Sequence, residues 1–111
     1  MSQNTSLTLL PQTVHNDGMV TGEARQAASY YLGNRDLQTI NWSVTYATCT
    51  LQIQATLSSS PEETDWFPVY EITYDNESET HYTNLSGNFV WVRAMVTDFS
   101  LGTINYVKIS Y

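Results

Sequence analysis

The amino-acid sequence predicts an all-β fold, an antiparallel β-sandwich of the jelly-roll type with about seven to nine strands. Apolar and polar residues alternate with period two along most of the chain after residue 38, which is typical of strands with one buried face. Turn-forming sequences interrupt this alternation every ~8–12 residues. Only residues 23–32, EARQAASYYL, are a candidate helix, and the paired Tyr30 and Tyr31 favour a strand over 26–32 instead.

The longest alternating stretch covers residues 39–57, TINWSVTYATCTLQIQATL. Its apolar positions run from Ile40 to Tyr46 and again from Cys49 to Leu57, with Thr, Gln, Asn and Ser between them. The phase of the alternation changes near Ala47, which predicts either a tight antiparallel turn or a bulge at that point. The uncharged polar face suits a sheet that faces water or a neighbouring subunit.

Further strands are predicted over 6–10, 66–74, 80–85, 89–99 and 103–111, with turns or loops at 58–65, 75–79, 86–88 and 100–102. Pro68 places the start of its strand at an edge or a bulge. No repeat or linker divides the chain, so we expect residues 1–111 to form a single domain. Residues 1–25, which lack a clear periodicity, are a candidate irregular N-terminal arm that reaches a neighbouring subunit.

Charge and composition exclude several classes of partner. The net charge is −7, and the four cationic residues are scattered, which argues against nucleic acid and against an anionic membrane surface. The N-terminus lacks the features of a signal peptide, and no apolar run approaches the ~18 residues of a spanning helix. We therefore expect a protein that is made in a cytoplasm and stays soluble. A single cysteine, Cys49, excludes an intrachain disulfide.

Few residues have the spacing that catalysis or metal binding requires. His15 lies in a turn and His81 in a polar alternating run, and neither belongs to a metal-binding pattern. Cys49 falls on the apolar face of its strand, as a small buried residue would. Two loops gather carboxylates that either stay solvated or bind Ca²⁺, and the first interpretation is favoured: Glu62, Glu63 and Asp65, and Asp75, Glu77 and Glu79. We predict neither an enzyme nor a cofactor or metal site.

Aromatic residues, at 13% of the chain, are the other candidates for a functional surface. Trp66, Phe67 and Tyr70 lie near the break at Pro68, where exposed rings could stack on a sugar or bury against another protein. Trp42 occupies an apolar strand position, which favours the core. Trp91 also occupies an apolar strand position, which favours the core in the same way.

The segment 88–96, NFVWVRAMV, carries an arginine between apolar residues. Alternation places Val90, Val92, Ala94 and Val96 on an inner face, and Phe89, Trp91, Arg93 and Met95 on an outer or interfacial face. There the stem of Arg93 can lie along Trp91, and its guanidinium can find a carboxylate. This phase weakens the prediction of a buried Trp91 and makes Arg93 a structural or interface residue.

The second half of the chain resembles a β-sandwich module of structural proteins in tailed phages, especially marine cyanophage-like viruses. The motifs are I-x-A-T-L, a later P and D-W-F, then G-N-F-V-W-V-R-A-x-V and G-T-I, within residues 38–111. The matching positions are Ile53, Ala55, Thr56, Leu57, Pro61, Asp65, Trp66, Phe67, Gly87, Asn88, Phe89, Trp91, Arg93, Gly102, Thr103 and Ile104.

This resemblance implies a non-enzymatic virion protein, assembled in the bacterial host cytoplasm. It favours a capsid decoration or a tail or baseplate accessory subunit, with other virion proteins as partners and a homo-oligomeric state. The alternative is a carbohydrate-binding module that recognises a glycan on the host surface. For either function the candidate binding residues are Trp66, Phe67, Tyr70, Trp91 and Arg93.

Overall fold

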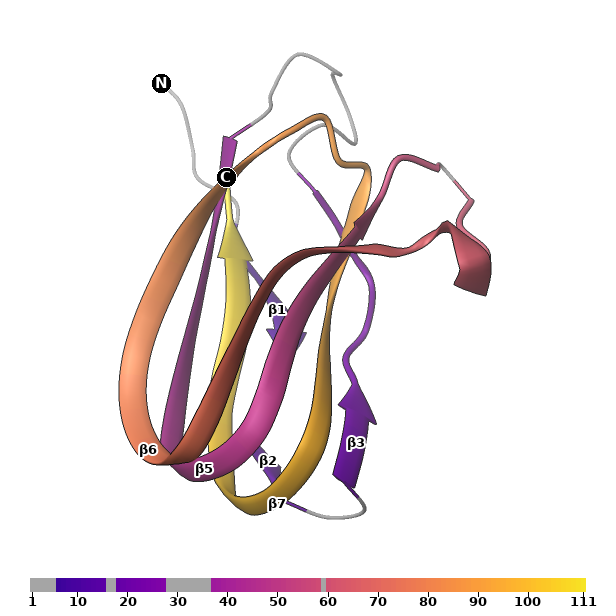
Figure 1. Ribbon diagram of the computed structural model, residues 1–111. Helices are drawn as coiled ribbons and strands as arrows, with labels where there is room; N and C mark the ends of the chain where they lie inside the picture. Colours follow the sequence, from indigo (N-terminus) through magenta and orange to yellow (C-terminus); the bar gives the residue numbers. More distant parts are fainter. Residues whose placement is uncertain (1–5, 16–17, 28–36, 59) are drawn as a thin grey trace.

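The computed structural model describes residues 6–15, 18–27, 37–58 and 60–111 of the chain (Figure 1). Three strands of 20 residues each dominate it: β5 (Leu37–Thr56), β6 (Phe67–Ser86) and β7 (Trp91–Ser110). Each long strand bends in its middle, and the three bends lie together at the bottom of Figure 1. One half of each strand therefore belongs to each of two packed layers. The predicted all-β, antiparallel, sandwich-like fold is confirmed.

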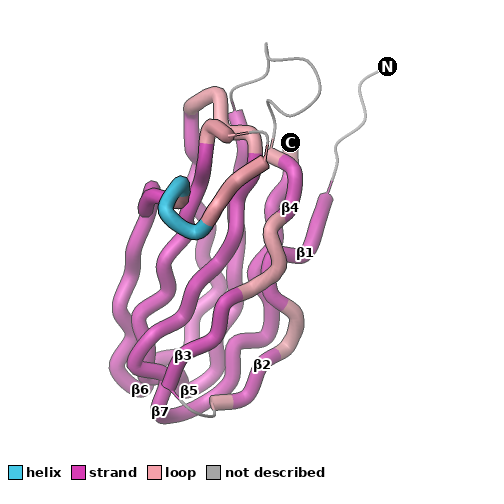
Figure 2. The backbone as a smooth tube through the Cα atoms, turned by 90° about the vertical axis from the view of Figure 1, so that its right-hand side faces the viewer, coloured by secondary structure: helices cyan, strands magenta, loops and turns pink. Residues whose placement is uncertain are grey.

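Four short strands complete the sheet: β1 (Ser6–Leu10), β2 (Thr13–Val14), β3 (Gly18–Thr21) and β4 (Arg25–Gln26). All four pair antiparallel with β7, and Figure 2 shows that they follow both of its halves. The strand order is β1-β7-β5-β6, so β6 is an edge strand among the described residues. The described part of residues 1–25, the candidate arm, thus lies along β7. Of the strand predicted over 26–32, residues 28–32 lie outside the described residues.

The bends depend on residues in the left-handed region of backbone conformation. The turning residues are Tyr46 in β5 (φ 48°), Asn76 in β6 (φ 51°) and Asp98 in β7 (φ 53°), and Gly102 (φ 84°) completes the bend of β7. Glycine, Asn and Asp adopt this conformation at the lowest cost. The pairing of β5 with both neighbours shifts register at this level, as at a bulge, and resumes in the second half.

These bends explain how the observed strands differ from the predicted ones. The phase change near Ala47 is a bulge and not a tight turn, because β5 continues through it. The segments 75–79 and 100–102, predicted as turns that end strands, are bends inside β6 and β7. Neighbouring strands bend at the same level, so their hydrogen bonding resumes on the other side.

The core fills the space between the two layers. Trp42, Tyr74 and Phe99 are its largest fully buried side chains, and the inner residues of β7 predicted by alternation, such as Val92 and Ala94, are buried with them. Trp42 is thus a core residue, as predicted. Its indole Nε1 donates a hydrogen bond to the hydroxyl of Tyr74 at 2.7 Å, and that hydroxyl donates to Oε1 of Glu79 at 3.0 Å. None of the described residues belongs to a helix long and apolar enough to cross a membrane.

Substituting Gly102 with alanine should destabilise the fold more than the same change at Gly18. Both glycines have a positive φ, so alanine is strained at either position, by about 1–3 kcal/mol. A Cβ at Gly102 would also collide with the backbone carbonyl of Tyr46, whereas a Cβ at Gly18 would meet nothing within 4 Å. Urea unfolding of the two variants measures the difference. Equal losses of unfolding free energy would show that the bends of β5 and β7 do not depend on this close approach.

Candidate functional site

The outer face of one layer carries a cluster of polar side chains from three strands. It is formed by the second half of β5 and the first halves of β6 and β7. Leu51, Ile53 and Ala55 of β5 point into the core, so the residues between them, Gln52 and Gln54, point outward. Strand pairing sets Gln54 opposite Arg93 of β7 and Gln52 opposite Glu71 of β6. Residues far apart in the sequence therefore form one row across the sheet.

Arg93 is the centre of this row. Its Nε donates a hydrogen bond to Oε1 of Gln54 at 2.7 Å. Its two terminal nitrogens donate to the carboxylate of Glu63, at 2.9 and 3.3 Å, in a bidentate pair. The guanidinium carbon lies 4.4 Å from the centre of the Trp66 ring, within cation–π distance. These contacts leave Arg93 only 8% exposed, although it points away from the core.

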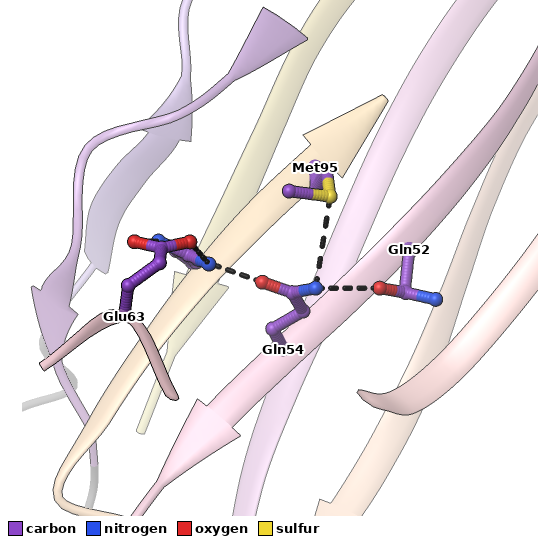
Figure 3. Close-up of polar contacts among 5 residues, drawn as sticks. Gln52, Gln54, Glu63 and Met95 are labelled. Carbon is purple, nitrogen blue, oxygen red and sulfur yellow. Dashed lines mark hydrogen bonds and ion pairs between the residues drawn. The ribbon is translucent and has the colours of Figure 1, made fainter. Parts of the chain in front are cut away.

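The row continues from Gln54 toward the edge of the sheet (Figure 3). The Nε2 group of Gln54 donates to Oε1 of Gln52 at 2.6 Å and lies 3.6 Å from the sulfur of Met95. Gln52 in turn donates from Nε2 to Oε2 of Glu71 at 2.9 Å. We call Glu63, Trp66, Arg93, Gln54, Gln52 and Glu71 the outer-face cluster. Each of the two glutamine amides donates a hydrogen bond to the next side chain in the row. These bonds fix the orientation of both amides.

The loop between β5 and β6 supplies Glu63 and Trp66. A single turn of 3₁₀ helix, η1 (Glu63–Asp65), begins after Glu62, whose backbone N–H donates to Oδ2 of Asp65 at 2.8 Å. Trp66 follows this turn directly. The hydrogen bond from Arg93, and then its positive charge, lower the pKa of the Glu63 carboxyl. The ion pair therefore persists at neutral pH and is lost as the pH falls through that lowered pKa.

The structure divides the five candidate binding residues into two groups. Trp66 and Arg93 meet in the outer-face cluster, and Trp91, two positions before Arg93 in β7, is partly exposed. Phe67 and Tyr70 instead pack against the core. The ring of Phe67 lies edge-on to Phe89 at 6.1 Å, and the ring of Tyr70 lies 5.4 Å from that of Trp42. The bulge that Pro68 predicted shifts the register here.

Sequence reasoning found Arg93, the need for a carboxylate partner and Trp66, but it missed the other members of the cluster. The alternation in 48–57 marked Gln52 and Gln54 as a polar face, and nothing in that pattern distinguishes them from the neighbouring threonines. The partners Glu63 and Glu71 belong to segments whose distance from Arg93 depends on strand pairing. The guanidinium of Arg93 lies over Trp66, a ring 27 positions away, while the prediction placed its stem along Trp91.

The remaining candidates for chemistry are located elsewhere. Cys49 is buried, as predicted, and burial raises the pKa of its thiol to about 11, which keeps it protonated and a poor nucleophile. His15 and His81 are both exposed; His15 lies near the bend of β7, and His81 lies edge-on to Trp42. Within the described residues, no three His, Cys, Asp or Glu side chains are placed to hold a metal ion. The outer-face cluster offers fixed hydrogen-bond groups and an aromatic ring, which suit binding.

Comparison with known proteins finds relatives of the fold and no relative in sequence. No family model and no curated protein matches the chain. Among solved structures, the chain is similar to the prophage-derived protein YomS of SPBc2, with a TM-score of 0.65 and 15% identity over 97% of this chain and 91% of that one. The fold is one that a phage protein adopts.

Two other solved structures share the fold at lower similarity. The carbohydrate-binding module CBM29_1 of Piromyces equi has a TM-score of 0.56 and 10% identity, over 97% of this chain and 91% of that one. The K1 cleaved adhesin domain of Lys-gingipain from Porphyromonas gingivalis has a TM-score of 0.51 and 14% identity, over 97% and 98%. The phage likeness is thus found in the fold, and membership of a cyanophage-type virion module stays a prediction from the motifs.

Replacing Arg93 with alanine should destabilise the protein by about 1–3 kcal/mol, because Gln54 loses its donor and the arginine stem no longer covers the sheet. Arg25→Ala is the matched control. Its side chain is also paired with a glutamate, Glu23, but the side chain is 40% exposed against 10% for Arg93. Denaturant unfolding should show a clearly smaller loss for the control. Similar losses for both would mean that the outer-face cluster is not held by Arg93.

Proposed function

We propose that the chain is a non-enzymatic structural protein of a phage virion, a capsid decoration protein or a tail or baseplate accessory subunit. The observation that carries this proposal is the likeness to a prophage-derived protein along nearly the whole length of both chains. The phage-type motifs in residues 53–104 support it independently. In this proposal the protein works by burying surface against other virion proteins and against copies of itself.

The shape of the molecule is compatible with that work. As an edge strand, β6 carries backbone N–H and C=O groups on its outer side that a strand of another subunit could pair with. Four acidic residues along it, Glu71, Asp75, Glu77 and Glu79, would prevent this edge from pairing with a second copy of itself. A partner strand with positively charged side chains would not be repelled by these acidic residues.

Mass spectrometry of purified particles tests the proposal. In density-banded virions of a phage whose genome encodes this chain, the protein should be present in many copies, while a replication protein of the same phage serves as the absent control. Size-exclusion chromatography with light scattering should show an oligomer of the isolated chain. A protein that is strictly monomeric, and that is missing from particles while abundant in infected cells, would refute a structural role.

A second candidate function is carbohydrate binding at the host surface, and the outer-face cluster favours it. Sugars are bound by planar hydrogen-bonding groups beside an aromatic ring. Arg93 contacts both the Trp66 ring and the side-chain amide of Gln54, which is hydrogen-bonded to Gln52. The fold is shared with a carbohydrate-binding module. The proposal is second because the guanidinium of Arg93 lies over the Trp66 ring, where a sugar ring would otherwise stack on that face.

Titration with host polysaccharide, by calorimetry or on a glycan array, tests this alternative. Binding should be lost in Trp66→Ala and weakened in Gln52→Ala. Tyr82→Ala is the control, because Tyr82 is 59% exposed on the half of β6 that belongs to the other layer. If wild-type protein binds no glycan, or if the Tyr82 variant loses binding equally, the outer-face cluster is not a sugar site.

A further inference from the structure

The bent end of the sandwich exposes apolar side chains from four different strands. Of the seven large hydrophobic residues that are strongly exposed among the described residues, four belong to this end: Val14 (59%), Met19 (58%), Tyr46 (65%) and Leu101 (44%). We call these four residues the bend patch. Exposed apolar side chains that gather in one region of a surface commonly mark sites of interaction.

Strand pairing shows that the bend patch surrounds the bend of β7. Val14 of β2 is paired with Thr103, and Met19 of β3 is paired with Thr97. Leu101 lies in the bend itself, opposite Thr48 of β5. The backbone of Tyr46 lies against Gly102, where an added Cβ would collide with the Tyr46 carbonyl. Val14, Met19 and Tyr46 therefore lie beside the segment 97–103, which contains Leu101.

Tyr46 is the unusual residue of this group. The equivalent bends of β6 and β7 place Asn76 and Asp98 in the left-handed conformation, which these residue types tolerate well. At the same level β5 places a tyrosine, for which this conformation is costlier, and leaves its side chain 65% exposed. The ring gains little burial in return for the strain. Strained residues of this kind are concentrated at functional sites.

The neighbouring strands hold Tyr46 in place from both sides. Its backbone N–H donates to the hydroxyl of Ser78 in β6 at 2.9 Å, and Gly102 of β7 packs against its carbonyl. The backbone under the ring is therefore fixed before binding, and only the two side-chain torsions of the tyrosine lose freedom on binding. Rigid aromatic side chains are typical anchors of protein interfaces.

Acidic residues accompany the bend patch. Asp75 and Glu77 in the bend of β6 and Asp98 in the bend of β7 are all exposed. The described bend segments, 13–15, 18–19, 44–48, 74–79 and 97–102, contain no lysine or arginine. Two copies that met through this end would bring like charges together, and four side chains are few beside the ~800 Å² per partner of a standard interface.

We propose that the bend patch inserts into an apolar pocket rimmed by lysine and arginine on a different protein, with Tyr46 as the anchor. This inference rests on the proposed function, which makes that partner another protein of the virion. The apolar side chains would fill the pocket, and Asp75, Glu77 and Asp98 would face its basic rim. The contact would fix one end of the sandwich and leave both outer faces free.

The binding experiment uses particles assembled without this protein, to which purified chain is added and co-sedimented. Tyr46→Asn should weaken binding at least about tenfold, as the loss of a central aromatic anchor does. Because asparagine suits the left-handed conformation, this variant should keep or raise the melting temperature. Tyr82→Asn, which removes an equally exposed tyrosine away from the bend, should bind like the wild type.

A second variant in the same co-sedimentation experiment tests the role of the acidic residues. Asp98→Asn keeps a residue that tolerates the left-handed conformation and removes one acidic group from the rim. It should bind more weakly and show a shallower decrease of affinity with rising salt concentration. A variant that binds as the wild type does at every salt concentration would contradict the basic rim.

The outcomes separate this inference from the proposed function. If the wild type binds particles and Tyr46→Asn binds equally well, the bend patch is not the docking surface, while the structural role stands. If Tyr46→Asn converts an oligomer into a monomer, the patch joins copies of this chain, and the proposed partner is wrong. If the wild type neither binds particles nor occurs in them, the proposed function fails together with the inference.

Discussion

The fold depends on one backbone contact at the bent end of the sandwich. There Gly102 of β7 passes so close to Tyr46 of β5 that no side chain fits between them. Both residues are in the left-handed conformation, and Asn76 gives β6 the same change of direction at the same level. Three neighbouring strands can bend together only if each has a residue that tolerates this conformation. One antiparallel sheet thereby folds over itself and encloses a core without any inter-sheet loop in its central strands.

This way of building a sandwich determines where function can be located. A sandwich whose strands run through both layers has two outer faces, one bent end and one end with loops. On one outer face, the loop turn η1 docks through Glu63 onto Arg93, and the amides of β5 extend the hydrogen-bond row to β6. The bent end exposes apolar residues among acidic ones, which is the combination proposed above to dock on another protein. The chain thus has two candidate binding surfaces of different chemistry.

The sequence predicted the strand character and the inner face of the sheet well. Alternation placed Trp42, Cys49 and Val92 inside and Arg93 outside, and the structure agrees. It was less informative about Tyr70, which was expected in an exposed contact and packs on Trp42. Its strand was recognised, but the bulge after Pro68 changes which residues face the core. A one-residue shift of phase moves every later side chain to the other face, and the alternation within a single strand does not show at which residue such a shift occurs.

By itself, the sequence determined that this is an acidic, all-β protein with one buried face per strand, because the two-residue period of a strand is a local property. It also singled out Arg93 and Trp66. Only the tertiary structure decided that 75–79 and 100–102 are bends within continuous strands and that Glu63, Arg93 and Gln54 meet. It alone showed that Val14, Met19, Tyr46 and Leu101 share one end. Those facts depend on which strands pair and in what register, and pairing joins residues that are up to about 100 positions apart, as for Ser6 and Ser110. No periodicity within a single strand contains that information.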